Sequence, residues 1–148
     1  MSEDKLKVLI RDFDVDADLN FVYNSFLKSF RGALINKKIS NTVYFKNEQK
    51  ILTEHIQNPE AKIIIACNPD DETQIYGYLI YNFTENSIWW AYIKEAFRRF
   101  GVFKKLLIES KLDVTKPIIY RHDSFGWTQV VNAIKDLNFV YIPFYYTI

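Results

Sequence analysis

Cysteine is nearly absent from this chain, since Cys67 is the only one in 148 residues. A single cysteine excludes an internal disulfide, and it excludes zinc or C-x-x-C redox sites that need cysteine pairs. Glycine and proline are also scarce, with 4 of each, so collagen-like and loop-dominated folds are excluded. No hydrophobic run approaches ~20 residues, the length with which an α-helix spans a bilayer.

The N-terminus lacks a recognisable targeting signal. Its only early apolar run, residues 8–10, is too short for a signal peptide and follows an acidic start. We therefore expect a cytoplasmic protein that does not enter a membrane. An excess of one charge is missing too: 19 Lys and Arg stand against 18 Asp and Glu, which argues against a dedicated nucleic-acid binder.

What the chain does contain is the composition of a single globular domain over residues 1–148. Hydrophobic residues make up 49% and charged residues 25%, which excludes wholesale disorder. A chain of this length buries about two-thirds of its unfolded surface and needs no metal or disulfide to fold. The unusual feature of the composition is its aromatic fraction of 17%.

The first half of the chain predicts one strand followed by helices. Residues 7–13 alternate as in a strand, and Asp14 or Asp16 offers a side-chain oxygen that caps a helix. The helix then shows one apolar stripe at steps of three and four: Val15, Leu19, Val22, Phe26 and Phe30. Residues 32–47 are ambiguous, and residues 48–58 predict another helix that Pro59 ends.

The second half alternates strands with helices. Residues 62–67, 75–83 and 87–93 predict three strands of an antiparallel meander. After them we expect a helix at 101–112, a strand at 117–121, a helix at 127–137 and one or two terminal strands within 139–148. This order predicts an α/β fold with a mixed, mostly antiparallel sheet and helices on both faces. Trp89 and Trp90 should point to opposite faces of their strand, one into the core and the other toward a ligand or partner.

The most informative segment is a basic loop between a strand and a helix, residues 93–105 (IKEAFRRFGVFKK). From residue 94 to residue 105 it has five Lys or Arg and one Glu, so it carries a charge of +4 and the rest of the chain −3. Free N–H groups at a helix start form an anion site, and two adjacent arginines attract a pyrophosphate. The alternative is that Gly101 is a plain turn glycine beside a solvated rim of arginines.

This loop resembles the acetyl-coenzyme A loop of the GNAT acetyltransferase superfamily. That motif reads Gln/Arg-x-x-Gly-x-Gly/Ala and lies between the fourth strand and the third helix of the family. Arg98 and Gly101 match it, whereas Phe103 replaces the small final residue. The order of elements over residues 7–148 also resembles the superfamily.

The resemblance implies an N-acetyltransferase in which an amine attacks the thioester of acetyl-CoA directly. Backbone groups near Tyr92 and Ile93 would bind the pantetheine arm, in a V-shaped gap between strand 87–93 and the next strand. The loop would hold the pyrophosphate through Arg98, Arg99, Phe100, Gly101, Val102, Phe103 and Lys104.

The family's two common catalytic groups are both missing. The tyrosine that protonates the leaving thiolate corresponds to Ile134, and the glutamate base corresponds to Ser87, with Glu85 two residues earlier. The remaining candidates are His122 as a base and Ser124 as a proton donor. The alternative for this pair is a polar loop in which Ser124 caps the next helix.

Another pattern, Asp14-x-Asp16-x-Asp18, hints at a calcium loop. Leu19 occupies its glycine position and Ser25 its closing glutamate position, so we expect an acidic helix start and no metal site.

We therefore expect acetyl transfer to an unidentified amine. The alternative is a catalytically degenerate GNAT-fold protein that binds a protein partner, which the departures at Phe103, Ile134 and Ser87 favour. A partner or a second copy would meet the uncharged aromatic segment that begins at Phe139. A phosphate-binding module on nucleic acid is least expected, because the charge outside the loop is −3.

Overall fold

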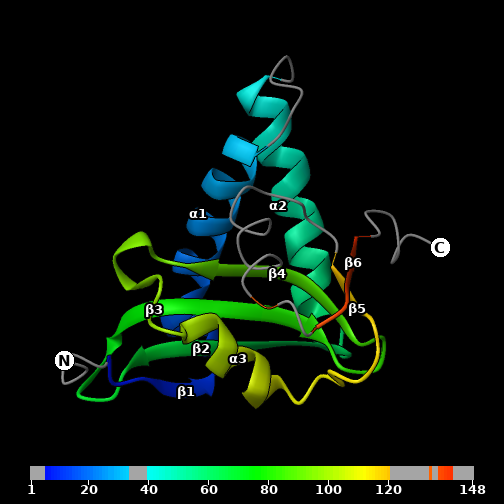
Figure 1. The fold of residues 1–148 in the computed structure, drawn as a ribbon. Coiled ribbons are helices and arrows are strands. Elements are labelled where there is room, and N and C mark those ends of the chain that lie inside the picture. Colours follow the sequence, from blue (N-terminus) through cyan, green and yellow to red (C-terminus); the bar gives the residue numbers. More distant parts are fainter. Residues whose placement is uncertain (1–5, 34–39, 121–133, 135–136, 142–148) are drawn as a thin grey trace.

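The computed structural model describes residues 6–33, 40–120, 134 and 137–141, and its six strands form one sheet (Figure 1). Across the sheet the strands follow the order of the chain: β1 (Leu9–Asp12), β2 (Ala61–Asn68), β3 (Asp71–Asn82), β4 (Ser87–Ile93), β5 (Ile118–Tyr120) and β6 (Phe139–Tyr141). Neighbours from β1 to β4 are antiparallel, whereas β5 is parallel to both β4 and β6. The predicted meander and the mixed, mostly antiparallel sheet are confirmed.

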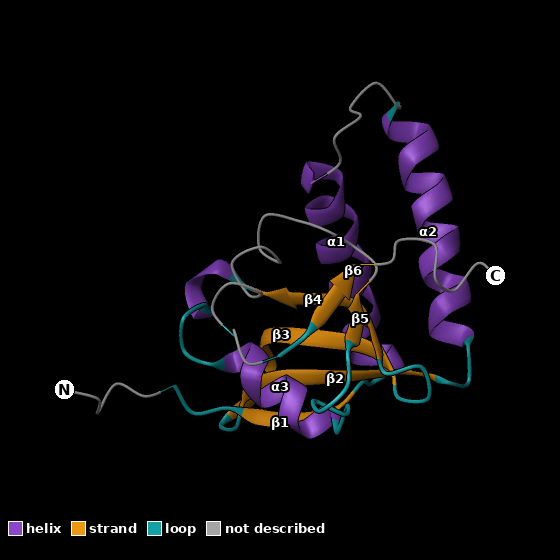
Figure 2. Ribbon diagram, turned by 45° about the vertical axis from the view of Figure 1, so that its right-hand side comes forward, coloured by secondary structure: helices purple, strands orange, loops and turns teal. Residues whose placement is uncertain are grey.

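Helices cover both faces of the sheet, as predicted (Figure 2). On one face lie α1 (Val15–Ala33) and α2 (Asn41–Gln57), and on the other lies α3 (Val102–Ser110). A short 3-10 helix, η1 (Glu95–Phe97), follows β4. Among the described residues, no helix combines the length and the apolar character that a membrane crossing requires.

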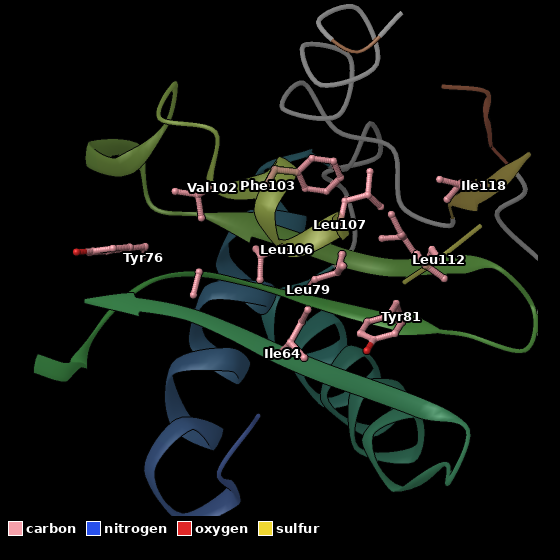
Figure 3. Packing of buried hydrophobic residues seen from close by; sticks show 12 residues of the cluster. Ile64, Tyr76, Leu79, Tyr81, Val102, Phe103, Leu106, Leu107, Leu112 and Ile118 are labelled. Atoms are coloured by element: carbon pink, nitrogen blue, oxygen red, sulfur yellow. The ribbon is translucent and has the colours of Figure 1, made fainter. Parts of the chain in front are cut away.

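Each face of the sheet has its own hydrophobic cluster. The cluster under α3 joins side chains of the helix to those of β2 and β3, among them Ile64, Leu79, Leu106 and Leu107 (Figure 3). The cluster under α1 and α2 is rich in rings: the centroid of Phe26 lies 4.9 Å from that of Trp89 and 5.1 Å from that of Trp90.

Helix α2 begins at Asn41, so the predicted start at residue 48 was wrong. The side-chain oxygen of Ser40 caps the helix by accepting a hydrogen bond from the N–H of Val43 at 3.2 Å. One turn in, the buried Tyr44 donates from its hydroxyl to the carbonyl oxygen of Leu27 in α1 at 2.7 Å. This contact between helices is not visible in the local apolar pattern.

The later residues of the predicted stripe of α1, Val22, Phe26 and Phe30, pack in the cluster under α1 and α2, as predicted. Val22 and Phe26 are fully buried, but Val15 is 54% exposed, because it lies at the very start of the helix. The predicted helix at 127–137 lies almost entirely outside the described residues, as do residues 142–148 of the predicted terminal strands.

A bidentate ion pair joins β1 to α1. Nη1 and Nη2 of Arg11 lie 2.7 and 2.8 Å from the two carboxylate oxygens of Asp18, a side chain that is 1% exposed. The backbone N–H of Asp14 also donates to Asp18, at 2.8 Å. Burial raises the pKa of Asp18, but the hydrogen bonds from Arg11 and Asp14 outweigh burial and hold that pKa below its ordinary value. Asp18 is therefore a structural anion of the helix start.

Candidate functional site

β4 contains one residue more than the stretch of β3 that it pairs with, and this changes how its tryptophans point. Ile80 pairs with Trp90 but Tyr81 pairs with Ile88, so Trp89 is an extra residue in a β-bulge. Trp89 and Trp90 consequently lie in the same cluster, beneath α1 and α2, and both are buried. The prediction of opposite faces was wrong, because strict alternation holds only in a regular strand.

The end of β4 lies unusually close to β3 because of Gly77. A Cβ on Gly77 would lie 2.3 Å from the carbonyl oxygen of Tyr92 and 2.6 Å from Cδ1 of Ile93. Only glycine allows this approach, so Gly77 lets the two residues predicted to bind pantetheine lie close against β3. The next residue, Lys94, donates from its backbone N–H to the carbonyl oxygen of Tyr76 at 2.8 Å. Gly77 was not predicted as a site residue, although a glycine inside a strand pattern is itself a signal of close backbone approach.

The loop after η1 enters α3 through two left-handed residues. The φ angle is 71° at Arg99 and 77° at Gly101, which is the N-cap of α3. Gly101 is needed for this angle and not for space, since a Cβ there would meet nothing within 4 Å. No side chain caps α3, and the N–H groups of Val102 and Lys104 donate to no acceptor within the described part of the chain. A helix start of this kind offers N–H groups to an anion.

Four exposed cations surround this helix start: Arg98, Arg99, Lys104 and Lys105. None of them forms an ion pair with a described residue. Arg98 is nevertheless held in place, because its Nε donates to the carbonyl oxygen of Ile93 at 2.8 Å and so ties the loop to the end of β4. The first turn of α3 contains no acid, although the helix dipole favours one there. The charges around α3 therefore oppose its dipole and suit an anionic ligand.

The two phenylalanines of the loop have different surroundings. Phe103, which occupies the small-residue position of the motif, is 9% exposed and belongs to the cluster under α3 (Figure 3). Its ring is therefore a core side chain. Phe100 is 46% exposed.

On the far side of β4, the side chain of Asn86 joins the β3–β4 turn to the chain between α3 and β5. Its Nδ2 donates to the carbonyl oxygens of Asp113 and Pro117, both at 3.0 Å. Its Oδ1 accepts from the N–H of Asp113 at 2.7 Å. The local sequence around Asn86 gives no signal of these long-range hydrogen bonds.

Beside this junction, β5 pairs with only the first two residues of β4. Ser87 pairs with Ile119 and Ile88 with Tyr120. None of the described residues pairs with the remainder of β4 on that side, where the V-shaped gap is predicted.

The candidate catalytic residues His122 and Ser124 lie outside the described residues, so their roles stay predictions. Ile134, which stands at the position of the family's acid, packs against the cluster under α3. Ser87, at the position of the family's base, donates from its hydroxyl to Glu85 at 3.4 Å. The structure thus brings Glu85 and Ser87 together at the start of β4.

Three aromatic rings lie together near the end of β4, on the face of the sheet that α1 and α2 cover. The ring centroids of Phe21, Tyr78 and Tyr92 lie 5.8 to 6.1 Å apart, and Nζ of Lys94 lies 5.0 Å from the Phe21 centroid. Burial raises the pKa of Tyr78, whose hydroxyl lies 2.7 Å from Oγ of Ser25. Tyr78 therefore stays protonated at neutral pH and cannot act as a base.

Comparison with known proteins gives structural matches alone. No family model and no curated protein matches the sequence. A candidate acetyl transferase from Pyrococcus furiosus aligns with a TM-score of 0.62 and 14% identity, over 84% of this chain and 91% of that one. A GNAT-family acetyltransferase from Staphylococcus aureus Mu50 aligns with a TM-score of 0.54 and 17% identity, over 86% of this chain and 81% of that one. A transcriptional regulator from Bacillus halodurans C-125 aligns with a TM-score of 0.51 and 14% identity, over 87% of this chain and 90% of that one.

The chain therefore has the GNAT fold. Because one structure that aligns with it is described as a regulator, the fold by itself does not determine the activity, which has to be argued from the site.

Proposed function

We propose that this protein is an N-acetyltransferase that binds acetyl-CoA at the start of α3 and transfers the acetyl group to an amine. The observation that carries the proposal is the start of α3, which no described side chain caps and which four exposed cations flank in the chain. A pyrophosphate carries negative charge and several acceptor oxygens, which is what such a helix start binds.

Two parts of the coenzyme, the pantetheine arm and the pyrophosphate, have counterparts among the described residues. The pantetheine arm lies along β4, where Tyr92 and Ile93 present backbone groups. The pyrophosphate accepts from the N–H groups of Val102 and Lys104. Arg98 supports both parts at once, because its bond to the Ile93 carbonyl oxygen joins the loop to β4.

The chemistry of the transfer needs two proton movements. The neutral amine attacks the thioester carbonyl carbon, the C–S bond breaks, the sulfur takes up a proton and the nitrogen loses one. A positioned acid contributes about 10²–10⁴-fold to such a step, and Ile134 cannot donate a proton. We therefore expect slow transfer, with Ser124 as candidate donor and His122 as candidate base.

Calorimetric titration with acetyl-CoA tests the binding step. We expect saturable binding, and ligand at ~100 times its dissociation constant should stabilise the fold by about 2.7 kcal/mol. The double substitution Arg98→Glu and Arg99→Glu should abolish most of the binding. The matched control is Lys46→Glu with Lys50→Glu, which makes the same change of charge on exposed residues of α2. Absence of binding by the native chain at millimolar ligand would overturn the proposal.

A second function is favoured by the apolar packing of Ile134 against the cluster under α3, because a side chain at this position that is only apolar offers no acid. In this alternative the chain has lost catalysis and binds a protein partner or a second copy through the segment that begins at Phe139. Thiol-release assays with amines, lysine peptides and polyamines separate the two functions. Activity that rises in Ile134→Tyr would favour the enzyme, and binding of coenzyme without turnover in either form would favour the alternative.

A further inference from the structure

The connector between α3 and β5, residues 111–117, is held by short-range hydrogen bonds. Oγ of Ser110 donates to the carbonyl oxygen of Leu107 at 2.6 Å and accepts from the N–H of Leu112 at 3.2 Å. Oδ1 of Asp113 accepts from the N–H of Thr115 at 2.9 Å. Leu112 is buried in the cluster under α3. The end of α3 and the beginning of β5 are therefore parts of one unit.

Asn86 fastens this unit to β4. Its side chain uses both ends, since Nδ2 donates to Asp113 and Pro117 while Oδ1 accepts from Asp113. Its carbonyl oxygen also accepts from the N–H of Ile119 at 3.1 Å. Asn86 has a φ of 52°, a left-handed conformation that asparagine tolerates better than most residues. One residue thus connects the β3–β4 turn, the connector and β5.

We propose that Asn86 is a positioning residue for the coenzyme, which sets the placement of both β5 and α3 relative to β4. This inference rests on the proposed function, in which the pantetheine lies beside β4 and the pyrophosphate at the start of α3. The start of α3 belongs to the helix whose other end continues into the connector, and the predicted pantetheine gap lies between β4 and β5. Removing the hydrogen bonds of the Asn86 side chain should therefore let β5 and α3 move away from β4. It does so without changing a residue that is proposed to contact the coenzyme.

Asn82 provides a matched control in the same turn. It is buried at 4% exposure, and its Oδ1 accepts from the N–H of Glu85 at 3.0 Å. This hydrogen bond stays within the β3–β4 turn and does not reach the connector. Asn82→Ala therefore removes a hydrogen bond from the same turn but keeps the Asn86 bonds that join the connector and β5 to the start of β4.

The test measures the dissociation constant of acetyl-CoA by calorimetry, well below the melting temperature of every variant. Asn86→Gly removes the three side-chain hydrogen bonds and keeps a residue that accepts the positive φ. We expect it to weaken acetyl-CoA binding about tenfold, while Asn82→Ala stays within about twofold of the native chain. Asn86→Asp has nearly the same shape but sets a carboxylate oxygen against the carbonyl oxygens of Asp113 and Pro117, which repel it, so this second variant should weaken binding at least as much as Asn86→Gly.

Three outcomes are distinguishable. Weakened binding in both Asn86 variants with normal binding in Asn82→Ala supports the inference. Equal binding in the folded Asn86 variants and the native chain overturns it and leaves the proposed function standing. A native chain that binds no acetyl-CoA overturns the proposed function, and this inference with it.

Discussion

Two groups of cations in this molecule differ in what neutralises them. Arg11, in β1, forms a bidentate pair with the buried carboxylate of Asp18, at 2.7 and 2.8 Å. The cations at the start of α3 are exposed and form no ion pair with any described residue. The two groups have the same sign of charge, but only the first has an internal partner.

This difference separates a structural charge from a candidate functional one. Arg11 and Asp18 satisfy each other, so that removal of either one leaves a buried or half-buried charge without compensation. The cations of the loop instead repel one another and oppose the dipole of α3. Cations that lower the stability of the fold and have no ion-pair partner among the described residues are expected at a site that binds a ligand.

The largest effect is expected from Arg11→Ala. The substitution leaves the carboxylate of Asp18 buried without its partner, and we expect a loss of about 3–5 kcal/mol in the free energy of unfolding. Urea denaturation at neutral pH measures it. Arg99→Ala, an exposed arginine of the loop, is the control and should stay within about 0.5 kcal/mol of the native chain. Equal losses in the two variants would contradict the comparison.

A smaller loss is expected from Phe103→Ala. The ring of Phe103 is buried in the cluster under α3, and its truncation should cost about 3 kcal/mol. Because the pyrophosphate is expected to use backbone N–H groups, the affinity for acetyl-CoA should change little. Phe100→Ala, in the same loop but exposed, should leave stability almost unchanged. Tighter coenzyme binding in Phe103→Ala would instead show that the ring obstructs the site.

Parts of this fold could be predicted from the sequence, and other parts could not. The meander over residues 62–93 and the loop at Arg98 and Gly101 were predictable, because alternation, turn residues and the positive φ of a glycine are local properties. The bulge that turns Trp89 and the start of α2 were not, since each depends on a neighbouring strand or helix. The same holds for Gly77 and Asn86, whose contacts join parts of the chain that are distant in sequence.

Acid should reduce the stability that the Arg11–Asp18 ion pair contributes. It should not change the charge of the cations at the start of α3. The pKa of Asp18 in the folded protein lies below its unfolded value of about 3.9, so the pair contributes stability above that pH and loses it as the pH falls through the folded pKa. The loss should be smaller than in Arg11→Ala, because protonation removes the buried charge and Arg11 keeps its bond to the Glu72 carbonyl oxygen at 3.2 Å. Denaturation from pH 6 to about pH 2 measures it. Asp18→Asn should reduce this acid dependence, and an unchanged dependence would contradict the assignment.

The smallest effect on stability is a gain, expected from Lys104→Glu. Lys104 lies in the first turn of α3, which has no acid and no side-chain cap, so a glutamate there would complement the helix dipole. We expect the free energy of unfolding to rise by about 0.3–1 kcal/mol at low salt and the gain to shrink as salt is added. The same substitution should weaken acetyl-CoA binding, because it places a negative charge where the pyrophosphate is expected. Glu109→Lys, at the other end of the helix, is the control: it also improves the match to the dipole, but it should leave coenzyme binding nearly unchanged. If Lys104→Glu stabilised the fold without weakening binding, the cations at the start of α3 would have no ligand to explain them, and the contrast with Arg11 would lose its functional meaning.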